Sequence, residues 1–330
     1  MSRLVLLAIL LLALPVSADW HSDSAAIMGT RISVSLWHED QAQADILIEQ
    51  VMAEMRRIDK AFSPYKDQSE LSQLNRQAAA GETVTVSEEM ARLLDKSLYY
   101  GRLSDGAFDI TFASVGRYYD YRAGETPSES QREALLPAID YRHVQLQNRQ
   151  VRYQHPAVYI DLGGIAKGYA VDRAINLLAQ AGVKNASVSA GGDSRLLGDR
   201  RGRPWLVGIK QPRGSEGVAI SLPLENTAFS TSGDYERYFI DDKGEWVHHI
   251  INPRTGKSAE GIASVSILGP HTFDTDALST TVFVLGVEKG LTLINQLPDF
   301  DAVIITRSGK VHYSDGLAPP ENTAYDHTDH

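Results

Sequence analysis

The stretch DLGGIAKGYAVD (residues 161–172) joins an extended apolar segment, AVYIDL, to a helical pattern. Its two adjacent glycines permit a tight or left-handed backbone and the close approach of a ligand. A helix that begins near Ala166 would present unpaired amides to a phosphate, and Lys167 would add a positive charge. Asp161 is the odd member, because a carboxylate repels phosphate unless it binds sugar hydroxyls, a ring N–H or a metal. The stretch matches neither a Walker loop nor GxGxxG, so it indicates either an anion-binding turn or only a glycine-rich strand-to-helix turn.

Short strand candidates and helical patterns alternate around this stretch. RISVSLW (31–37) predicts a strand, and HVQLQNRQVRYQ (143–154) predicts two paired strands with a turn near Asn148. Ser87 is the expected N-cap of one helix. Another helix is predicted over residues 43–62, with a core face formed by Ile46, Ile48, Val51, Met52, Met55, Ile58 and Phe62. This order favours an α+β fold with mixed or antiparallel sheets flanked by helices.

The charge and cysteine content exclude some classes of function. The 330 residues carry a net charge of −10 and no dense basic run, which argues against nucleic-acid binding through a general electrostatic footprint. The sequence has no cysteine, so disulfides and lipid attachment through a lipobox thiol are excluded. We therefore expect a protein that is not a lipoprotein and that holds any anionic ligand through local groups.

The first 18 residues have the pattern of an export signal. Arg3 is followed by an apolar run from Leu4 to Leu14 and by small residues that end at Ala18. The run is shorter than the ~20 residues of a membrane span. It predicts a cleavable signal peptide over residues 1–18. One domain over residues 19–316 and a flexible tail over residues 317–330 are expected to follow.

The stretch DTDALSTT (274–281) is the candidate metal site. On a helix, Asp276 and Thr280 are four residues apart and lie on one face. A carboxylate and a hydroxyl are hard oxygen ligands of the kind that Mg²⁺ uses, with phosphate and water completing the octahedron. The alternative is an N-terminal cap cluster in which Asp274 or Thr275 caps the helix.

The stretch HHIINPRTG (248–256) predicts a turn after a strand. His249 is a candidate general base, because a neutral imidazole can accept a hydroxyl proton near neutral pH. His248 is expected on the other face of the strand and without a catalytic role. Arg254 either clamps a substrate or holds the turn. GxSxG, HExxH and a cysteine nucleophile are absent, which argues against hydrolase and zinc-enzyme interpretations.

Taken together and in order, these stretches resemble the ApbE family of FAD:protein FMN transferases. The resemblance covers residues 27–290 and is carried by MGT (28–30), SPYKDQSELSQLN (63–75), GAFDIT (106–111), DLGGIAKGYAVD, SAGGD (189–193), SGDYERYF (232–239), HIINPRTG (249–256) and DALSTTVFVLG (276–286). It implies an ApbE-like fold with a ligand cleft between two lobes. It also implies a periplasmic enzyme that uses Mg²⁺ to transfer FMN from FAD, its substrate, to a threonine or serine of an exported acceptor protein, releasing AMP. A subunit of an ion-pumping redox complex is one acceptor that the family would suggest.

The resemblance assigns roles to residues by their motif positions. The residues expected to contact FAD are Met28, Ser63, Tyr65, Asp109, Asp161 and Lys167, and Ile250 is expected to pack on the flavin nucleotide. The main-chain carbonyl of Gly164 is expected to ligate Mg²⁺ with Asp276 and Thr280. His249 is expected to activate the acceptor hydroxyl.

The sequence departs from the family pattern at two places, and two other interpretations of the whole chain are kept beside the transferase. Asn252 stands where the family often has aspartate, and FASVGRYYDY (112–121) replaces a segment that commonly reads VGPLVNLWGFG. The alternatives are an FAD pyrophosphatase, which would release free FMN and AMP, and a flavin-binding protein without turnover. The pair of Asp276 and Thr280 argues against the last, because binding a flavin does not require a metal.

Overall fold

A computed structural model describes residues 19–213 and 217–318 and is built around one large antiparallel sheet. The eight strands lie in the order β1-β2-β6-β7-β10-β15-β16-β17, and each neighbouring pair is antiparallel. Their bounds are β1 (Asp19–Ile27), β2 (Thr30–His38), β6 (Ala186–Ala190), β7 (Asp193–Leu197), β10 (Ala228–Gly233), β15 (Ile262–Gly269), β16 (Asp301–Thr306) and β17 (Val311–Tyr313).

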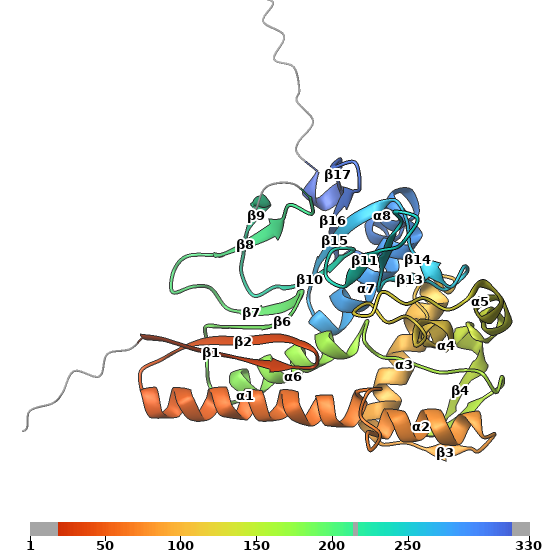
Figure 1. Ribbon diagram of the computed structural model, residues 1–330. Coiled ribbons are helices and arrows are strands. Elements are labelled where there is room, and N and C mark those ends of the chain that lie inside the picture. The colour runs from red at the N-terminus through yellow and green to blue at the C-terminus, as the bar shows by residue number, and fades with distance from the viewer. Residues whose placement is uncertain (1–18, 214–216, 319–330) are drawn as a thin grey trace, which may run out of the picture.

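Four helices cover one face of this sheet (Figure 1). They are α1 (Gln41–Phe62), α6 (Ala166–Gln180), α7 (Thr272–Leu285) and α8 (Val287–Asn295). Alternate residues of each strand point to the helices, as Ile32, Val34 and Leu36 do from β2, and these side chains are fully buried. On the opposite face, a hairpin of β8 (Trp205–Lys210) and β9 (Val218–Leu224) packs Ile209 against Val303. The sheet therefore has its main core on the helical side.

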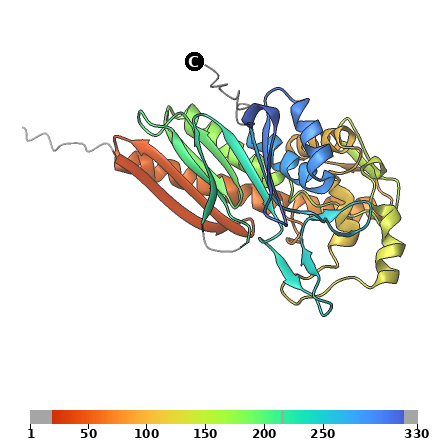
Figure 2. The same ribbon diagram turned by 90° about the horizontal axis from the view of Figure 1, so that it is seen from above.

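A second group of elements lies beside the ends of these helices (Figure 2). It contains α2 (Glu70–Ala79), α3 (Glu88–Leu103), η1 (Ile110–Phe112), α4 (Ala113–Gly116), α5 (Glu129–Leu135), η2 (Leu136–Ala138), η3 (Tyr141–His143) and a small sheet of β3 (Val84–Thr85), β5 (Gln150–Tyr153) and β4 (Val144–Gln147). Two hairpins follow β10, namely β11 (Tyr238–Ile240) with β12 (Trp246–His248) and β13 (Ile251–Asn252) with β14 (Lys257–Ser258), and η4 (Asp315–Leu317) follows β17. The fold is α+β, as expected.

Most of the local predictions are confirmed, and one core residue is corrected. Ser87 caps α3 by accepting the Met90 N–H at 3.1 Å, and Asn148 has a φ of 50° in the turn between β4 and β5. In α1, Ile46 is 50% exposed, so its place on the core face was wrong. Successive residues of a helix are rotated by about 100°. Ile46 therefore lies on the side of α1 roughly opposite Ile48, Met52 and Met55.

The predicted signal peptide (1–18) lies outside the described residues, and so does the predicted tail apart from its first two residues. Among the described helices, none has the length and apolar character needed to cross a bilayer.

Candidate active site

The loop before α6 is shaped by its own carboxylate. Asp161 accepts the Gly163 N–H at 2.6 Å, and its backbone N–H donates to the Ile110 carbonyl at 2.9 Å. Burial raises the pKa of Asp161, while this hydrogen bond and the nearby cations Arg237 and Lys167 act to lower it. Asp161 therefore stabilises the turn before α6, and the Lys167 side chain points toward other acids.

Lys167 points toward two buried carboxylates. Its Nζ lies 2.9 Å from Asp193 Oδ2, 3.2 Å from each carboxylate oxygen of Asp276 and 2.9 Å from the Gly163 carbonyl oxygen. Burial lowers the pKa of Lys167, but the two aspartates outweigh it and the net shift is upward. Burial, with repulsion from Asp193, raises the pKa of Asp276 to about 7. The site therefore holds one cation between two acids.

The helix α7, which carries Asp276, is fixed against α6 by the opening motif. Asp172 accepts the N–H groups of Thr272 at 3.0 Å and of Phe273 at 2.9 Å, so it caps α7 from a different helix. Asp276 Oδ2 in turn accepts the Gly168 N–H at 2.9 Å. The alternative interpretation, in which Asp274 or Thr275 caps this helix, is wrong because α7 begins earlier, at Thr272.

Asp274 instead ties α7 to α3. Its carboxylate lies 2.5 Å from Lys96 Nζ and also accepts the Tyr100 hydroxyl.

Gly168 is the point of closest approach between α6 and α7. A Cβ on this residue would lie 2.1 Å from the Thr272 carbonyl oxygen and 2.7 Å from Asp276 Cβ. Glycine to alanine inside a helix ordinarily stabilises by up to about 1 kcal/mol. Here we expect Gly168→Ala to lower the free energy of unfolding by about 1–3 kcal/mol, because the helices must separate. Urea unfolding measures the effect, and a stabilised variant would contradict the close contact.

The three residues predicted to ligate Mg²⁺ lie at this helix pair. Asp276 and Thr280 lie one turn apart on α7. A Cβ atom added to Gly164 would lie 3.4 Å from Thr280 Oγ1, so Gly164 is close to that hydroxyl. Among the described residues, Thr280 Oγ1 has one hydrogen-bond contact, to Ser232 Oγ at 3.4 Å. Within the described ranges, no group of three or more His, Cys, Asp or Glu side chains could hold a metal. A cation here would depend on one carboxylate, hydroxyl and carbonyl oxygens, and its substrate.

Met28 and His249 are linked through Arg237. Met28 (φ 55°) and Gly29 (φ 68°) form the turn between β1 and β2, and Arg237 Nη2 contacts the Gly29 carbonyl oxygen at 3.3 Å. The His249 N–H donates to the Arg237 carbonyl at 3.1 Å, at the base of the β11–β12 hairpin. Burial, then the Arg237 charge, lowers the pKa of His249 to about 3. The imidazole is therefore neutral, and its buried Nδ1 makes no hydrogen bond to the described residues.

His248 is held in the core by its ring nitrogens, and its lack of a catalytic role stays a prediction. It is fully buried, its Nε2 contacts the Ala259 carbonyl at 2.8 Å, and its Nδ1 accepts the Ile250 N–H at 3.3 Å. Ile250 is only 5% exposed and belongs to the main core. The packing of Ile250 on a flavin nucleotide stays a prediction. Such a contact would involve only the small exposed part of this side chain.

The other predicted flavin contacts differ in their exposure. Tyr65 is 84% exposed, and Ser63 Oγ accepts the Tyr65 N–H at 3.3 Å. Asp109 is 7% exposed and caps η1, accepting from Thr111 N–H and Oγ1 at 2.8 and 2.5 Å and from Tyr141 N–H at 2.7 Å. Burial raises the pKa of Asp109 to about 6. Tyr65 is thus open to a ligand, whereas Asp109 supports the loop around it.

The turn at residues 252–256 explains how Asn252 can stand where the family often has aspartate. Asn252 Oδ1 accepts the Arg254 N–H at 3.0 Å, an Asx turn that asparagine and aspartate form equally well. Arg254 Nη2 pairs with Asp105 at 3.0 Å, and both side chains are largely exposed. Arg254 therefore holds the turn in this structure, which is one of the two roles considered for it.

Residues 28–304 match the sequence pattern of the ApbE family. This chain belongs to the ApbE family. It is 31% identical over 319 residues to the FAD:protein FMN transferase of Treponema pallidum, a match that covers 90% of this chain and 87% of that protein. A Klebsiella pneumoniae FAD:protein FMN transferase is 31% identical, with 87% and 90% covered. The crystal structure of the ApbE protein of Thermotoga maritima superposes with a TM-score of 0.82 at 32% identity, covering 90% of this chain and 98% of that one.

Four site residues of this ApbE-family chain were not singled out from sequence. Asp193 and Arg237 lie in stretches recognised as polar clusters, SAGGD and SGDYERYF, but neither received a role. Asp172 closes the opening motif and caps α7. Asn75 ends SPYKDQSELSQLN and bonds both polar groups of Ile160, donating to its carbonyl and accepting its N–H at 2.9 Å each. Position within a motif was the available signal for all four.

Asn75 holds the extended approach to Asp161 in place. Its Oδ1 also accepts the Tyr153 hydroxyl at 2.9 Å, and the side chain is 2% exposed. Asn75→Ala would leave these buried groups unpaired, so we expect a loss of unfolding free energy of about 1–3 kcal/mol. Urea unfolding measures it, with exposed Gln77→Ala on the same helix as the control. Equal stability of the two variants would remove this role from Asn75.

The segment that departs from the family pattern lies beside the hairpins. The Tyr119 hydroxyl donates to the Gly256 carbonyl at 2.8 Å, and the Tyr119 and Tyr121 rings stack with centroids 5.8 Å apart. Tyr121 also lies 6.4 Å, between centroids, from Phe239 of β11. This ApbE-family chain therefore uses its own tyrosines to brace the HIINPRTG turn and the β11–β12 hairpin.

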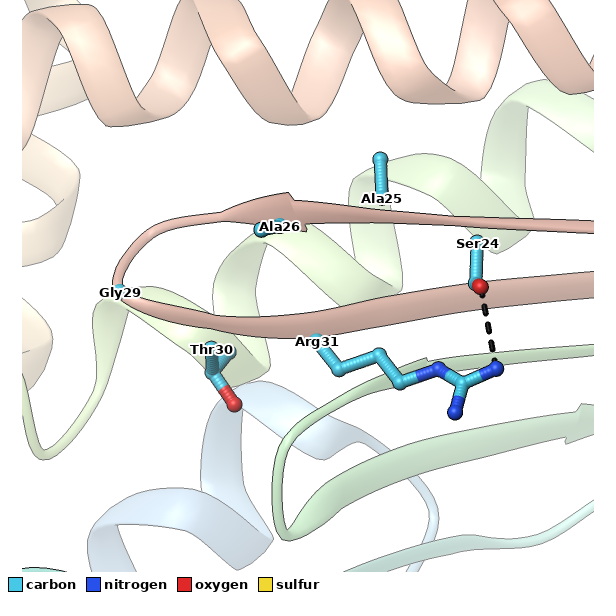
Figure 3. A pocket seen from close by; sticks show the side chains of 6 residues that line it. All are labelled: Ser24, Ala25, Ala26, Gly29, Thr30 and Arg31. Carbon is cyan, nitrogen blue, oxygen red and sulfur yellow. Dashed lines mark hydrogen bonds between the residues drawn. The ribbon is translucent and has the colours of Figure 1, made fainter.

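Two surface hollows lie on the β1–β2 hairpin, and the second also extends over Ser187 and Ser189 of β6. One of about 420 Å³ is lined by Ser24, Ala25, Ala26, Gly29, Thr30 and Arg31. Figure 3 shows that it is bordered by the turn at Gly29 and by the Arg31–Ser24 hydrogen bond of 3.1 Å. Neither hollow contains Lys167 or Asp276. The ligand cleft between two lobes stays a prediction.

Proposed function

We propose that this chain is an FAD:protein FMN transferase, which moves FMN from FAD to a threonine or serine hydroxyl of an acceptor protein and releases AMP. The supporting observation is the junction of α6 and α7, where Lys167, Asp276, Thr280 and Gly164 meet at the N-terminus of a helix. The names of the relatives at 31% identity agree with this activity. An anionic pyrophosphate would find there a cation, the positive end of a helix dipole and oxygen ligands for a metal.

The donor set at this junction fits Mg²⁺. Asp276 supplies a buried carboxylate, Thr280 a weakly engaged hydroxyl and Gly164 a carbonyl, which are all hard oxygen ligands. A bound Mg²⁺ would neutralise charge on the pyrophosphate oxygens as a Lewis acid. Lys167 would add charge balance, and the positive end of the α6 helix dipole would favour phosphate oxygens at this position.

In the transfer, the acceptor hydroxyl oxygen attacks the phosphorus on the FMN side of the pyrophosphate. The bond from that phosphorus to the bridging oxygen breaks, and AMP leaves with the electron pair. The hydroxyl proton passes to His249, which is neutral before the reaction because burial and Arg237 disfavour its charged form. An anionic substrate beside Arg237 and Lys167 would raise the pKa of this imidazole toward the range of an effective base.

The flavin half of FAD would lie toward Met28, Ser63 and Tyr65, with Ile250 at its edge and Asp161 accepting a hydrogen bond from a ring or ribose. Asp109 would support this side of the site, since its carboxylate oxygens are engaged by Thr111 and Tyr141. The signal sequence over residues 1–18 supports export to the periplasm, where the acceptor would be another exported protein, such as a subunit of an ion-pumping redox complex.

Mass spectrometry of a threonine-containing acceptor peptide tests the proposal. The peptide is incubated with the protein, FAD and Mg²⁺, and EDTA serves as the control. A Mg²⁺-dependent gain of ~438 Da, the mass of FMN less water, is the expected result of phosphoester transfer. Free FMN without modified peptide would favour an FAD pyrophosphatase. Intact FAD with two different acceptor peptides would favour a flavin-binding protein.

A further inference from the structure

Asp193 is held rigidly at the start of β7. It pairs with Ala190 of β6 on one side and with Ser230 of β10 on the other. The preceding turn leaves no room for adjustment, because Gly191 has a φ of +62° and a Cβ on Gly192 would lie 2.3 Å from the Thr231 carbonyl oxygen. The side chain is 2% exposed. Its carboxylate is thus a fixed buried charge that faces Lys167 across the site.

The ammonium group of Lys167 has more acceptors than donors. Four oxygens lie within 3.2 Å of it, namely Gly163 O, Asp193 Oδ2 and both carboxylate oxygens of Asp276. A lysine has only three N–H bonds to give. Asp276 also accepts the Gly168 N–H, whereas Lys167 is the one side-chain partner of Asp193 in the described part of the chain. Asp193 Oδ2 lies at ion-pair distance from Lys167 but accepts no hydrogen bond from the described residues. It can therefore take an N–H of Lys167 when that side chain gives up Asp276 and keeps Gly163.

We propose that Asp193 is a positioning residue, which retains Lys167 beside the Gly163 carbonyl when the Asp276 carboxylate is taken by a divalent cation. This inference rests on the metal site of the proposed function. In this role, Asp193 draws Lys167 away from the Asp276 oxygens. The lysine then stays in the site and does not compete with the metal for those oxygens.

Electrostatics supports this division of roles. An unpaired buried ammonium is costly, so without Asp193 the Lys167 charge would remain on Asp276. A divalent cation would then have to displace Lys167 from Asp276, which would be the one carboxylate left to pair with the lysine. With Asp193 present, Lys167 keeps a buried carboxylate partner 2.9 Å away when a divalent cation takes the Asp276 oxygens.

The test measures Mn²⁺ affinity by electron paramagnetic resonance on the folded, flavin-free protein. Four forms make a double-mutant cycle: wild type, Asp193→Asn, Lys167→Met and the double variant. Asp193→Asn is expected to bind Mn²⁺ roughly tenfold more weakly than wild type. In the Lys167→Met background, the same change is expected to have little effect, because no lysine remains to be held.

Asp274→Asn is the matched control, since it also removes a buried aspartate that pairs with a lysine, on the same helix as Asp276. It should leave Mn²⁺ affinity unchanged, and thermal unfolding confirms that each form is folded. Equal Mn²⁺ affinity in wild type and Asp193→Asn would overturn the proposal. An equal loss in both backgrounds would also overturn it, and would make Asp193 a direct ligand. Failure of wild type itself to bind Mn²⁺ would instead count against the metal site of the proposed function.

Discussion

Asp276→Ala is expected to abolish metal-dependent FMN transfer while the protein still binds flavin. Asp276 supplies the only carboxylate among the three predicted metal ligands, and it is 3% exposed, so water cannot easily replace it. A metal contributes several kcal/mol of charge stabilisation in such reactions, and each 1.36 kcal/mol is a factor of ten in rate. The rate of transfer should fall by ~10³-fold or more. The expected flavin contacts Met28 and Tyr65 lie on other elements, so flavin affinity should persist.

Peptide modification followed by mass spectrometry gives the rate, and quenching of flavin fluorescence gives the affinity. Asp274→Asn is the control for damage to α7, because it breaks the ion pair with Lys96 on the same helix. That control should lower the unfolding temperature but keep transfer by the folded protein. Normal FMN transfer by Asp276→Ala would remove this residue from the metal site.

The sequence predicted the parts of the site that depend on local pattern. Glycines followed by a helical period placed the start of α6 at Ala166, and the spacing of four between Asp276 and Thr280 placed both on one face of α7. Both features follow from the geometry of a single helix, so neighbouring residues are enough to predict them.

Contacts across the fold could not be predicted in the same way. The pair of Lys167 and Asp193 depends on the position of β7 in the sheet, and Asp172 caps a helix that begins 100 residues later. The alternative interpretation of this stretch looked for the cap of α7 within its own sequence, at Asp274 or Thr275, and it does not hold because α7 begins at Thr272. The strand β1 also gave little signal, because an edge strand with the sequence DWHSDSAAI needs few apolar residues.

His249→Ala is expected to slow FMN transfer by ~10²–10⁴-fold, the usual contribution of a general base. Its neighbour His248 gives the contrasting variant. Because both ring nitrogens of His248 are engaged in the core, His248→Ala should lower the free energy of unfolding by about 1–3 kcal/mol. Transfer per folded molecule should remain close to wild type. Similar small effects of both changes on the rate would remove His249 from the mechanism.

The stability of these variants also depends on pH in a way that the site geometry dictates. Burial holds the pKa of His249 near 3, whereas the imidazole of the unfolded chain has a value near 6.5. Between these values the unfolded state binds the extra proton, so wild type must lose stability as the pH falls from about 6.5 toward 3. His249→Gln cannot take up that proton and should lose less unfolding free energy between about pH 7 and about pH 5. Urea unfolding at both pH values measures the difference. Parallel losses in wild type and His249→Gln would mean that folding does not lower the pKa of His249, which would contradict its burial beside Arg237.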